Sequence, residues 1–498
     1  MKKSILLFMG ITLVAGLYAR PQKSGHWVEV PDYPYSLTAS QDKDIKEVSE
    51  ELKKQWADPV LQEEIELGIK TNRMGSFYVG FFDPKGRPVK VDNVSISLKK
   101  HEFLFGMQAF LTEGFHHIEK DAKLAEEKNR KFEELFSNLF NFATLPFYWA
   151  TSEPEPGFYR FSRNENKPDI YRRPPPDIVL EMCKRHDITP KGHCLSWHLA
   201  TSNASRPKWV PESKHEYEKY MCRYIDKVAE RYDGKIDYWD VTNENTDKRH
   251  AIWSINTPDP HGFMPDDYGF KAFKEAERVF RGSNRFISNY TTPVWQRVAA
   301  FREYSSDYLA ISDLINRGAK LDIIGLQLHF FGKDDYQNAL KGIEWGPEYQ
   351  RVVLDTLSRF NRPIHITEIT FPCFGDGEVG EANQAFFVEN FYKLWFSHKN
   401  VEAITYWHFV DGTAGGEDRF MSGFLRKDMS KKPSYIALEN LLKKWRTDLN
   451  FDSVDDKLHF RAFYGKYLIT YEYNGKKYEK TVNLSAKDSN RYKKIFVE

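Results

Sequence analysis

Two carboxylic acids follow apolar stretches of this chain at positions where they could act together. Glu244 ends the run from Trp239 to Glu244, directly after an amide side chain, and Glu368 closes a second apolar run. Cleavage of a glycosidic bond needs two such groups, one that gives and takes a proton and one that stabilises or traps the sugar cation. The pair therefore predicts glycoside hydrolysis, provided that the fold brings the two carboxylates together.

Eight apolar runs predict the fold that must position these carboxylates. After residue 100, short strand-like runs alternate with long charged runs of helical character, which is typical of repeated βα units around a buried parallel sheet. The predicted strands are 103–110, 139–145, 188–197, 236–243, 285–291, 321–330, 363–370 and 401–409. Eight parallel strands, each followed by a helix, form a (β/α)8 TIM barrel, an α/β fold whose catalytic groups lie at the C-terminal strand ends. Glu244 and Glu368 then end strands four and seven and point into the barrel mouth.

Strand patterns outside the barrel predict a small accessory β module. Two strands, at 76–82 and 91–98, are joined by turn residues at 83–88, and Asn474-Gly475 marks a two-residue hairpin turn near the C-terminus. A lone hairpin is only marginally stable. We therefore expect the N- and C-terminal β segments to pair with each other in one module.

The N-terminus has the three parts of a signal peptide. Lys2 and Lys3 precede an apolar run at 5–14, and a stretch ending in Ala19 suits cleavage. Because the apolar run is too short to cross a bilayer, we expect export to the periplasm or secretion, without a membrane span. The predicted organisation is a signal peptide at 1–19, a partly helical extension at 20–75, β segments of the accessory module at 76–100 and 447–498, and the catalytic barrel at 101–446.

The composition argues against nucleic acid as a partner and leaves the role of the aromatic residues open. Lys and Arg total 72 against 71 for Asp and Glu, so no long-range field attracts nucleic acid. Aromatic residues make up 15% of the chain and either pack in the core or stack on sugar rings. The same choice applies to Phe460, Phe463 and Tyr464 of the accessory module, for which we favour packing. The four cysteines have neither C-x-x-C nor zinc-like spacing, so we expect free thiols and no metal site.

Several motifs occur in the same order as the predicted barrel strands. They are Gly192 to His198, Trp239 to Glu244, Gly325 to His329, Ile366 to Glu368, Ile404 to Trp407 and, downstream, Lys432 to Tyr435. Over residues 100–446 the chain thereby resembles glycoside hydrolase family 10, the xylanase family of retaining (β/α)8 enzymes. The resemblance implies cleavage of internal β-1,4-linkages of xylan or a related polysaccharide by double displacement. We expect a monomer that acts on polysaccharide or oligosaccharide and needs no cofactor.

By this resemblance, Glu244 is the general acid/base, Glu368 is the nucleophile, and Asn243 binds the 2-hydroxyl of the sugar at the cleavage site. A retaining pair lies about 5 to 5.5 Å apart, so each carboxylate raises the other's proton affinity. The other residues expected at the substrate site are His193, His198, Gln327, His329, Trp197, Trp407, Tyr290 and Tyr148. Structural roles stay open, namely a buried hydrogen bond for Gln327 and a place in the core for Trp407.

The second predicted strand departs from the family pattern. Family members carry a Glu-Asn pair and a Lys shortly before a Trp, and these residues hold the sugar one unit beyond the cleavage site, at subsite −2. Aligned on Trp149, this chain has Thr144, Leu145 and Tyr148 instead. Because sites that hydrogen-bond hydroxyls discriminate strongly, the atypical −2 subsite argues against unsubstituted xylan as the best substrate. The alternatives are the same mechanism on a different or decorated β-glycan, and a non-catalytic carbohydrate-binding barrel.

Overall fold

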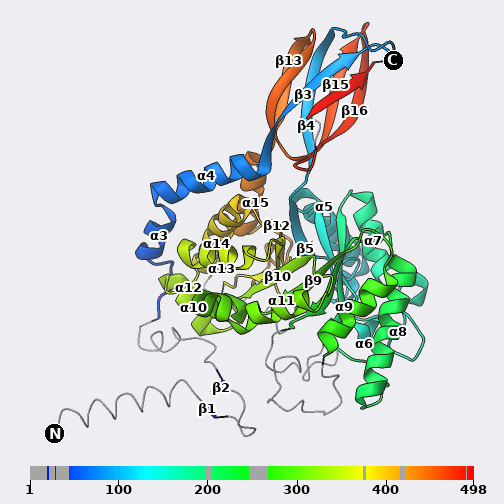
Figure 1. Cartoon of the computed structure of the whole chain (residues 1–498), viewed down its shortest axis with the longest axis vertical. Coiled ribbons are helices and arrows are strands. Elements are labelled where there is room, and N and C mark those ends of the chain that lie inside the picture. Colours follow the sequence, from blue (N-terminus) through cyan, green and yellow to red (C-terminus); the bar gives the residue numbers. More distant parts are fainter. Residues whose placement is uncertain are drawn as a thin grey trace, which may run out of the picture.

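The structure is a computed structural model that describes residues 20–21, 28–29, 44–197, 205–245, 267–373, 377–414, 421–488 and 491–497. Its centre is a closed barrel of eight strands in the order β10-β11-β12-β5-β6-β7-β8-β9, all parallel (Figure 1). The strands are β5 Leu104–Gln108, β6 Phe142–Pro146, β7 Thr189–Trp197, β8 Tyr238–Asn243, β9 Arg285–Tyr290, β10 Ile323–His329, β11 Ile364–Thr370 and β12 Val401–Tyr406. The predicted TIM barrel is confirmed, whereas the predicted signal peptide at 1–19 lies outside the described residues.

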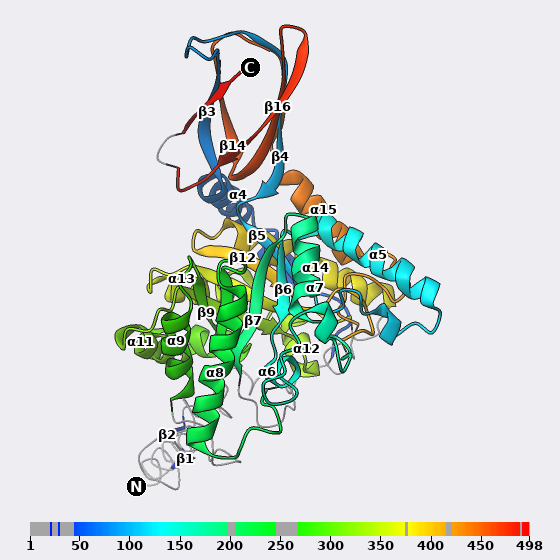
Figure 2. The same cartoon turned by 90° about the vertical axis from the view of Figure 1, so that its right-hand side faces the viewer.

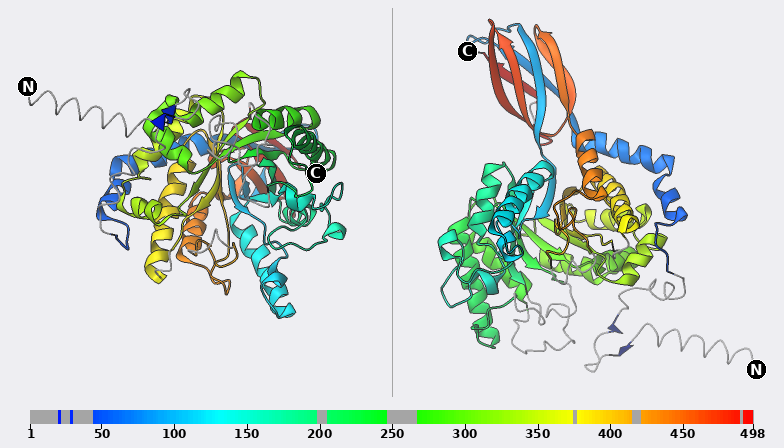
Figure 3. Two further views of the ribbon diagram at one scale, coloured as in Figure 1. Left: turned by 90° about the horizontal axis from the view of Figure 1, so that it is seen from below. Right: turned by 180° about the vertical axis from the view of Figure 1, so that it is seen from behind.

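Helices surround the barrel and cover the outer face of its strands (Figure 3). Every residue of β10 and of β11 is buried, because one strand face meets the helices and the other fills the barrel. The helices are α5 Ala122–Leu139, α6 Trp149–Ser152, α7 Pro176–Arg185, α8 Lys214–Tyr232, α9 Tyr268–Val279, α10 Pro293–Phe301, α11 Ser306–Asn316, α12 Lys333–Lys341, α13 Pro347–Ser358, α14 Gly377–Ser397 and α15 Pro433–Lys444. Short 3-10 turns occur at η1 Phe115–His117, η2 Arg163–Glu165 and η3 Arg302–Tyr304.

Two further helices precede the accessory module, α3 Glu50–Trp56 and α4 Pro59–Arg73, after the two-residue strands β1 Arg20–Pro21 and β2 Val28–Glu29. Ser49 and Asp58 cap the two helices by accepting hydrogen bonds from backbone N–H groups of the first turn. The Trp56 ring packs 5.6 Å from the Phe391 ring of α14. Helices α3 and α4 therefore belong to the helical layer around the barrel.

The accessory module consists of two sheets that both terminal segments build, as predicted. The sheets are ordered β13-β4-β15-β16 and β14-β3-β17. Their strands are β3 Met74–Phe82, β4 Val91–His101, β13 Asp448–Val454, β14 Lys457–Phe463, β15 Gly465–Tyr473, β16 Lys476–Leu484 and β17 Tyr492–Phe496. Asn474 and Gly475 both have positive φ, 50° and 72°, which the favoured two-residue hairpin turn between β15 and β16 requires. The turn at 83–88, in contrast, carries the chain from one sheet to the other, since β3 and β4 do not pair.

The module stands off the end of the barrel that is opposite to the mouth (Figure 2). Strand β4 ends at His101 and barrel strand β5 begins at Leu104, so the module joins the N-terminal strand ends. Phe463 is 5% exposed and its ring lies 6.2 Å from Phe396 of α14, and Phe460 is also buried. These two aromatic side chains pack, as we favoured.

All four cysteines are unpaired thiols, and three of them are buried. Among the helices that the structure describes, none is long and apolar enough to cross a membrane.

Candidate active site

Glu368 is turned into the barrel mouth by an irregularity between two strands. Leu326 of β10 pairs with Ile366 of β11, but the next residue, Gln327, pairs with Glu368, so Thr367 is an extra residue in β11. Such an insertion re-aims the side chain that follows it. Glu368 consequently faces residues of other barrel strands and is only 4% exposed.

Three polar side chains surround the Glu368 carboxylate. Asn289 Nδ2 donates to Oε1 at 2.9 Å, and Gln327 Nε2 donates to the same oxygen at 3.1 Å. His329 Nε2 lies 3.2 Å from Oε2, while its Nδ1 lies 2.8 Å from the hydroxyl of Thr370. Hydrogen bonds to a carboxylate favour its ionised form, which a nucleophile needs. The structure thus brings the predicted Gln327 and His329 to the predicted nucleophile.

Glu244 occupies a different environment at the end of β8. Its φ of 55° lies in the left-handed region, which costs a non-glycine residue of order 1 kcal/mol or more and is typical of functional sites. Its Oε2 accepts a hydrogen bond from Trp197 Nε1 at 2.9 Å, and the side chain is less buried than that of Glu368. Trp197 therefore contacts the predicted acid/base itself, where we expected it to contact substrate.

An amide network joins Asn243 to Glu368. Asn243 Oδ1 accepts hydrogen bonds from Asn289 Nδ2 at 2.9 Å and from Gln327 Nε2 at 3.2 Å. Asn289 also accepts from the hydroxyl of Thr367 at 2.5 Å, so its amide orientation is set from both ends. With the oxygen of Asn243 held in this way, its Nδ2 group is the donor that remains for a sugar hydroxyl.

Asn289 is a site residue that the sequence reasoning missed, and Tyr290 is a wrong prediction. Tyr290 is fully buried in the main hydrophobic core, because alternate residues of a strand point to opposite faces. Asn289 points into the barrel and Tyr290 points out toward the helices. The only sequence signal for Asn289 was a polar residue near the end of predicted strand five.

Replacing Asn289 with alanine is expected to lower kcat by about 10- to 100-fold, because a hydrogen bond to a charged group contributes about 1.5 to 3 kcal/mol. The loss removes one of the two donors that Glu368 and Asn243 share and leaves only Gln327. The matched control is Ser288→Ala, since Ser288 points to the outer face and pairs with the Thr242 hydroxyl. Steady-state kinetics on the best substrate compare the two variants. An Asn289→Ala enzyme with the kcat of the Ser288→Ala enzyme would contradict the assignment.

Aromatic side chains lie beside these polar groups, with the Trp407 ring 6.4 Å from that of His329. Phe110, Tyr148 and Trp407 pack as a cluster of their own, with Trp197 against it. The guanidinium of Arg173 lies 3.9 Å from the centroid of the Tyr148 ring. Of the three residues at the atypical subsite, Tyr148 thus belongs to the mouth, whereas Leu145 is in the main core and Thr144 is fully buried.

Contacts among buried polar side chains hold His193 in place. Lys191 Nζ and His193 Nδ1 lie 2.9 and 2.6 Å from Asp240 Oδ2, and all three side chains are buried. Burial raises the pKa of the Asp240 carboxyl, but Lys191 and His193 outweigh this effect and hold that pKa below its usual value. His193 Nε2 lies 3.9 Å from Glu368 Oε1 and has no hydrogen-bond partner within the described part of the chain. That nitrogen faces the site, whereas His198 lies outside the described residues.

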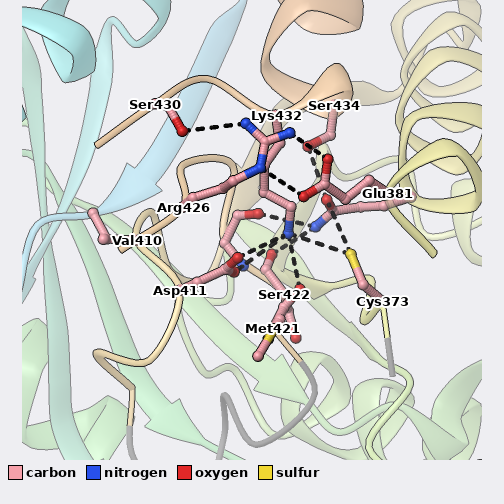
Figure 4. A network of polar contacts seen from close by, with 12 residues as sticks. Cys373, Glu381, Val410, Asp411, Met421, Ser422, Arg426, Ser430, Lys432 and Ser434 are labelled. Carbon is pink, nitrogen blue, oxygen red and sulfur yellow. Dashed lines mark hydrogen bonds and ion pairs between the residues drawn. The ribbon is translucent and has the colours of Figure 1, made fainter. Parts of the chain in front are cut away.

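Lys432 anchors the loop that follows Trp407 (Figure 4). Its ammonium group is fully buried and lies 3.2 Å from Asp411, 2.9 Å from the carbonyl oxygen of Met421 and 3.3 Å from the Cys373 thiol. Asp411 in turn accepts a hydrogen bond from the backbone of Gly423. Lys432, the first residue of the motif Lys432 to Tyr435, thus holds together the segments that contain Cys373, Asp411 and Met421.

Lys432→Met is expected to lower the free energy of unfolding by about 3 to 5 kcal/mol, because it leaves the Asp411 carboxylate buried without its lysine. Lys431→Met is the matched control, since Lys431 makes a partly exposed pair with Glu439 at 2.9 Å, worth about 1 kcal/mol or less. Denaturant unfolding monitored by tryptophan fluorescence measures both. Equal losses in the two variants would show that the buried pair is unimportant.

The chain is similar to known proteins both in sequence and in fold. A family model described as glycosyl hydrolase family 10 matches residues 160–441. Curated relatives include the anti-sigma-I factor RsgI6 of Acetivibrio thermocellus, 26% identical over 70% of this chain and 41% of that protein. They also include endo-1,4-beta-xylanase B of Neocallimastix patriciarum, 25% identical over 51% of this chain and 27% of that protein. The chain spans less than half the length of each of these relatives.

Two solved structures share the barrel fold. Xylanase 10B from Thermotoga petrophila, solved in complex with xylobiose, has a TM-score of 0.53 and 20% identity, covering 69% of this chain and 94% of that one. Native xylanase 10B from Thermotoga maritima has a TM-score of 0.52 and 22% identity, covering 69% and 95%.

Proposed function

Because the chain belongs to glycosyl hydrolase family 10, we propose that it is a retaining glycoside hydrolase that cleaves internal β-1,4-linkages of xylan or a related polysaccharide. The observation that carries the proposal is the Glu368 carboxylate, held by Asn289, Gln327 and His329. The same amides bind Asn243, which directly precedes Glu244. A carbohydrate-binding barrel without catalysis would have no need for this arrangement.

The proposed reaction has two displacements at the anomeric carbon. Glu368 attacks that carbon while Glu244 gives its proton to the leaving oxygen, and a glycosyl ester of Glu368 forms. Glu244, now ionised, takes a proton from water, which displaces Glu368 and restores the starting configuration. Asn243 donates to the sugar 2-hydroxyl, an interaction that strengthens as the oxocarbenium-like transition state forms.

A second candidate substrate is a different or decorated β-glycan, which the aromatic part of the mouth favours. Tyr148 packs with Phe110 and Trp407 beside the Arg173 guanidinium, so this part of the mouth is aromatic where the family has amide, carboxylate and ammonium groups. Those groups are the ones that select hydroxyls. The catalytic proposal is the same for either substrate.

Hydrolysis of a panel of unsubstituted xylan, glucuronoxylan, arabinoxylan and mixed-linkage β-glucan tests the proposal. Products are identified by mass spectrometry, and proton NMR follows the first anomer released. We expect internal cleavage of at least one xylan-type glycan with the β-anomer formed first. Release of the α-anomer first would rule out the double displacement, whereas cleavage of only the glucan would overturn the substrate and leave the mechanism standing.

We also propose that residues 1–19 are a signal peptide, that the mature protein is exported, and that it acts as a monomer. The charged Lys2 and Lys3, the apolar run and Ala19 support export. Cell fractionation with N-terminal sequencing tests the first two points, and light scattering coupled to gel filtration tests the third. A cytoplasmic protein that keeps Met1 would contradict export.

A further inference from the structure

Two histidines and an aspartate converge outside the candidate active site. His116 Nε2 lies 2.7 Å from Asp169 Oδ2, and His117 Nε2 lies 3.2 Å from Asp169 Oδ1. One nitrogen of each imidazole and one carboxylate oxygen all lie within 4.8 Å of one another. The histidines end η1, in the loop after β5, and Asp169 lies between η2 and α7. The cluster therefore joins two separate loops.

The ring of His116 is oriented like that of a metal ligand. Its Nδ1 lies 2.9 Å from the carbonyl oxygen of Glu113. A carbonyl only accepts, so Nδ1 carries a proton, and Nε2 of the neutral ring is then an acceptor. Nε2 and the Asp169 carboxylate oxygen then both present lone pairs toward each other, as two ligands of one cation do. Metal-bound histidines commonly fix their tautomer in this way, through a backbone carbonyl.

The Asp169 carboxylate is also held by hydrogen bonds that lead to the interior. Asn166 Nδ2 donates to Asp169 Oδ1 at 3.0 Å, and Arg160 donates to the Asn166 oxygen at 2.7 Å. Arg160 is only 2% exposed, so this support is anchored in the interior. Such outer contacts orient a ligand for a metal ion.

We propose that His116, His117 and Asp169 bind a divalent transition-metal ion of the zinc class. Two imidazole nitrogens, one carboxylate oxygen and a water are a donor set for zinc, whereas calcium and magnesium select oxygen ligands. Ligand atoms around a tetrahedral zinc ion lie about 3.3 Å apart, given bonds of about 2.0 to 2.1 Å. The separation between His117 Nε2 and Asp169 Oδ1, 3.2 Å, is close to that value. The separation between His116 Nε2 and Oδ2, 2.7 Å, must widen by about 0.6 Å, which these partly exposed side chains allow.

The ion would link the loop that contains Asp169 to the loop after β5, close to the barrel mouth. Along the same segment, Tyr171 donates to the carbonyl oxygen of Thr413 at 2.5 Å, and Arg173 lies over the Tyr148 ring. Cross-linking the two loops through a metal stabilises the folded state, because the ion binds a site that the unfolded chain lacks. This inference does not depend on the proposed hydrolysis.

Titration of the chelator-treated full chain with zinc chloride, followed by calorimetry at neutral pH, tests the site. Cobalt chloride, followed by visible absorption, is a second probe. We expect binding by the parent protein and at least a tenfold weaker affinity in His117→Ala and in Asp169→Asn, which keeps the side-chain size. The control is His215→Ala, whose side chain is 86% exposed and lies outside the cluster. Its affinity should equal that of the parent.

The melting temperature gives an independent readout. Zinc should raise it in the parent and in His215→Ala, and not in Asp169→Asn, with circular dichroism showing that all variants are folded. A parent that binds neither ion would overturn the proposal. So would an Asp169→Asn protein that binds zinc as tightly as the parent, because the ion would then lie elsewhere.

Discussion

Glu368→Ala is expected to lower kcat by roughly 10⁴-fold or more on every glycan that the parent cleaves, about 5.4 kcal/mol of barrier. The variant lacks the carboxylate that forms the glycosyl ester. It keeps Asn289, Gln327 and His329, so substrate affinity should change far less than turnover. Initial rates at saturating substrate and binding of an oligosaccharide by calorimetry separate the two effects.

Two further tests distinguish a lost nucleophile from a damaged fold. Azide is small enough to enter the space left by the Glu368 side chain, and it should restore cleavage of an activated aryl glycoside while producing a glycosyl azide of inverted configuration. The matched control is Glu389→Ala on α14, which loses only the surface pair with Lys393 and should turn over like the parent. If Glu368→Ala hydrolysed the best substrate as fast as Glu389→Ala, Glu368 would have no catalytic role.

Glu244→Ala is expected to show a loss that depends on the leaving group. On a polysaccharide, whose leaving alcohol needs a proton, kcat should fall by about 10² to 10⁴-fold, the usual contribution of a general acid. On an aryl glycoside with an acidic phenol, the first displacement needs no proton, so the phenol should appear in a rapid burst. The second displacement stays slow because no base activates water.

The pH profile adds a readout that misfolding would not mimic. In the parent, the rate on polysaccharide should fall at high pH as Glu244 loses its proton before the first displacement. The variant should lack that basic limb. Equal losses on both substrates, with the limb kept, would show that another group is the acid.

The barrel was predictable because its strands are buried on both faces. Continuous apolar runs of strand length have few other interpretations when charged helical stretches separate them. Strand β7 ends at Trp197 and β8 at Asn243, as predicted, so the placement of Glu244 at a strand end followed from the sequence. The hairpin of the accessory module was predictable from Asn474-Gly475.

The turn between β3 and β4 did not allow us to predict which strands each of them pairs with. A turn sets the local reversal of the chain, but distant segments decide which sheet each strand joins. Here β14 pairs with β3, while β13 and β15 pair with β4. The turn signal at 83–88 carries no information about those partners.

The prediction of Tyr290 as a substrate-site residue was wrong because the face of a strand that points inward is not fixed by that strand alone. A slip of one residue in register moves a side chain from one face to the other. In β9, Arg285, Ile287 and Asn289 are on one face and Phe286, Ser288 and Tyr290 on the other. Each set holds polar and apolar residues, so the sequence does not reveal which face is inward. Likewise, His116, His117 and Asp169 show no metal-binding spacing, because folding brings Asp169 to the two histidines.

Trapping of the glycosyl-enzyme tests the central claim most directly. The protein is incubated with a 2-deoxy-2-fluoro xylobioside that has a good leaving group, because the fluorine slows the second displacement and lets the ester accumulate. Peptide mass spectrometry then locates the label. We predict one fluoroglycosyl group on Glu368 and recovery of activity when an acceptor sugar releases it. Label on any other residue, or inactivation without a covalent adduct, would contradict the assignment of Glu368 as the nucleophile.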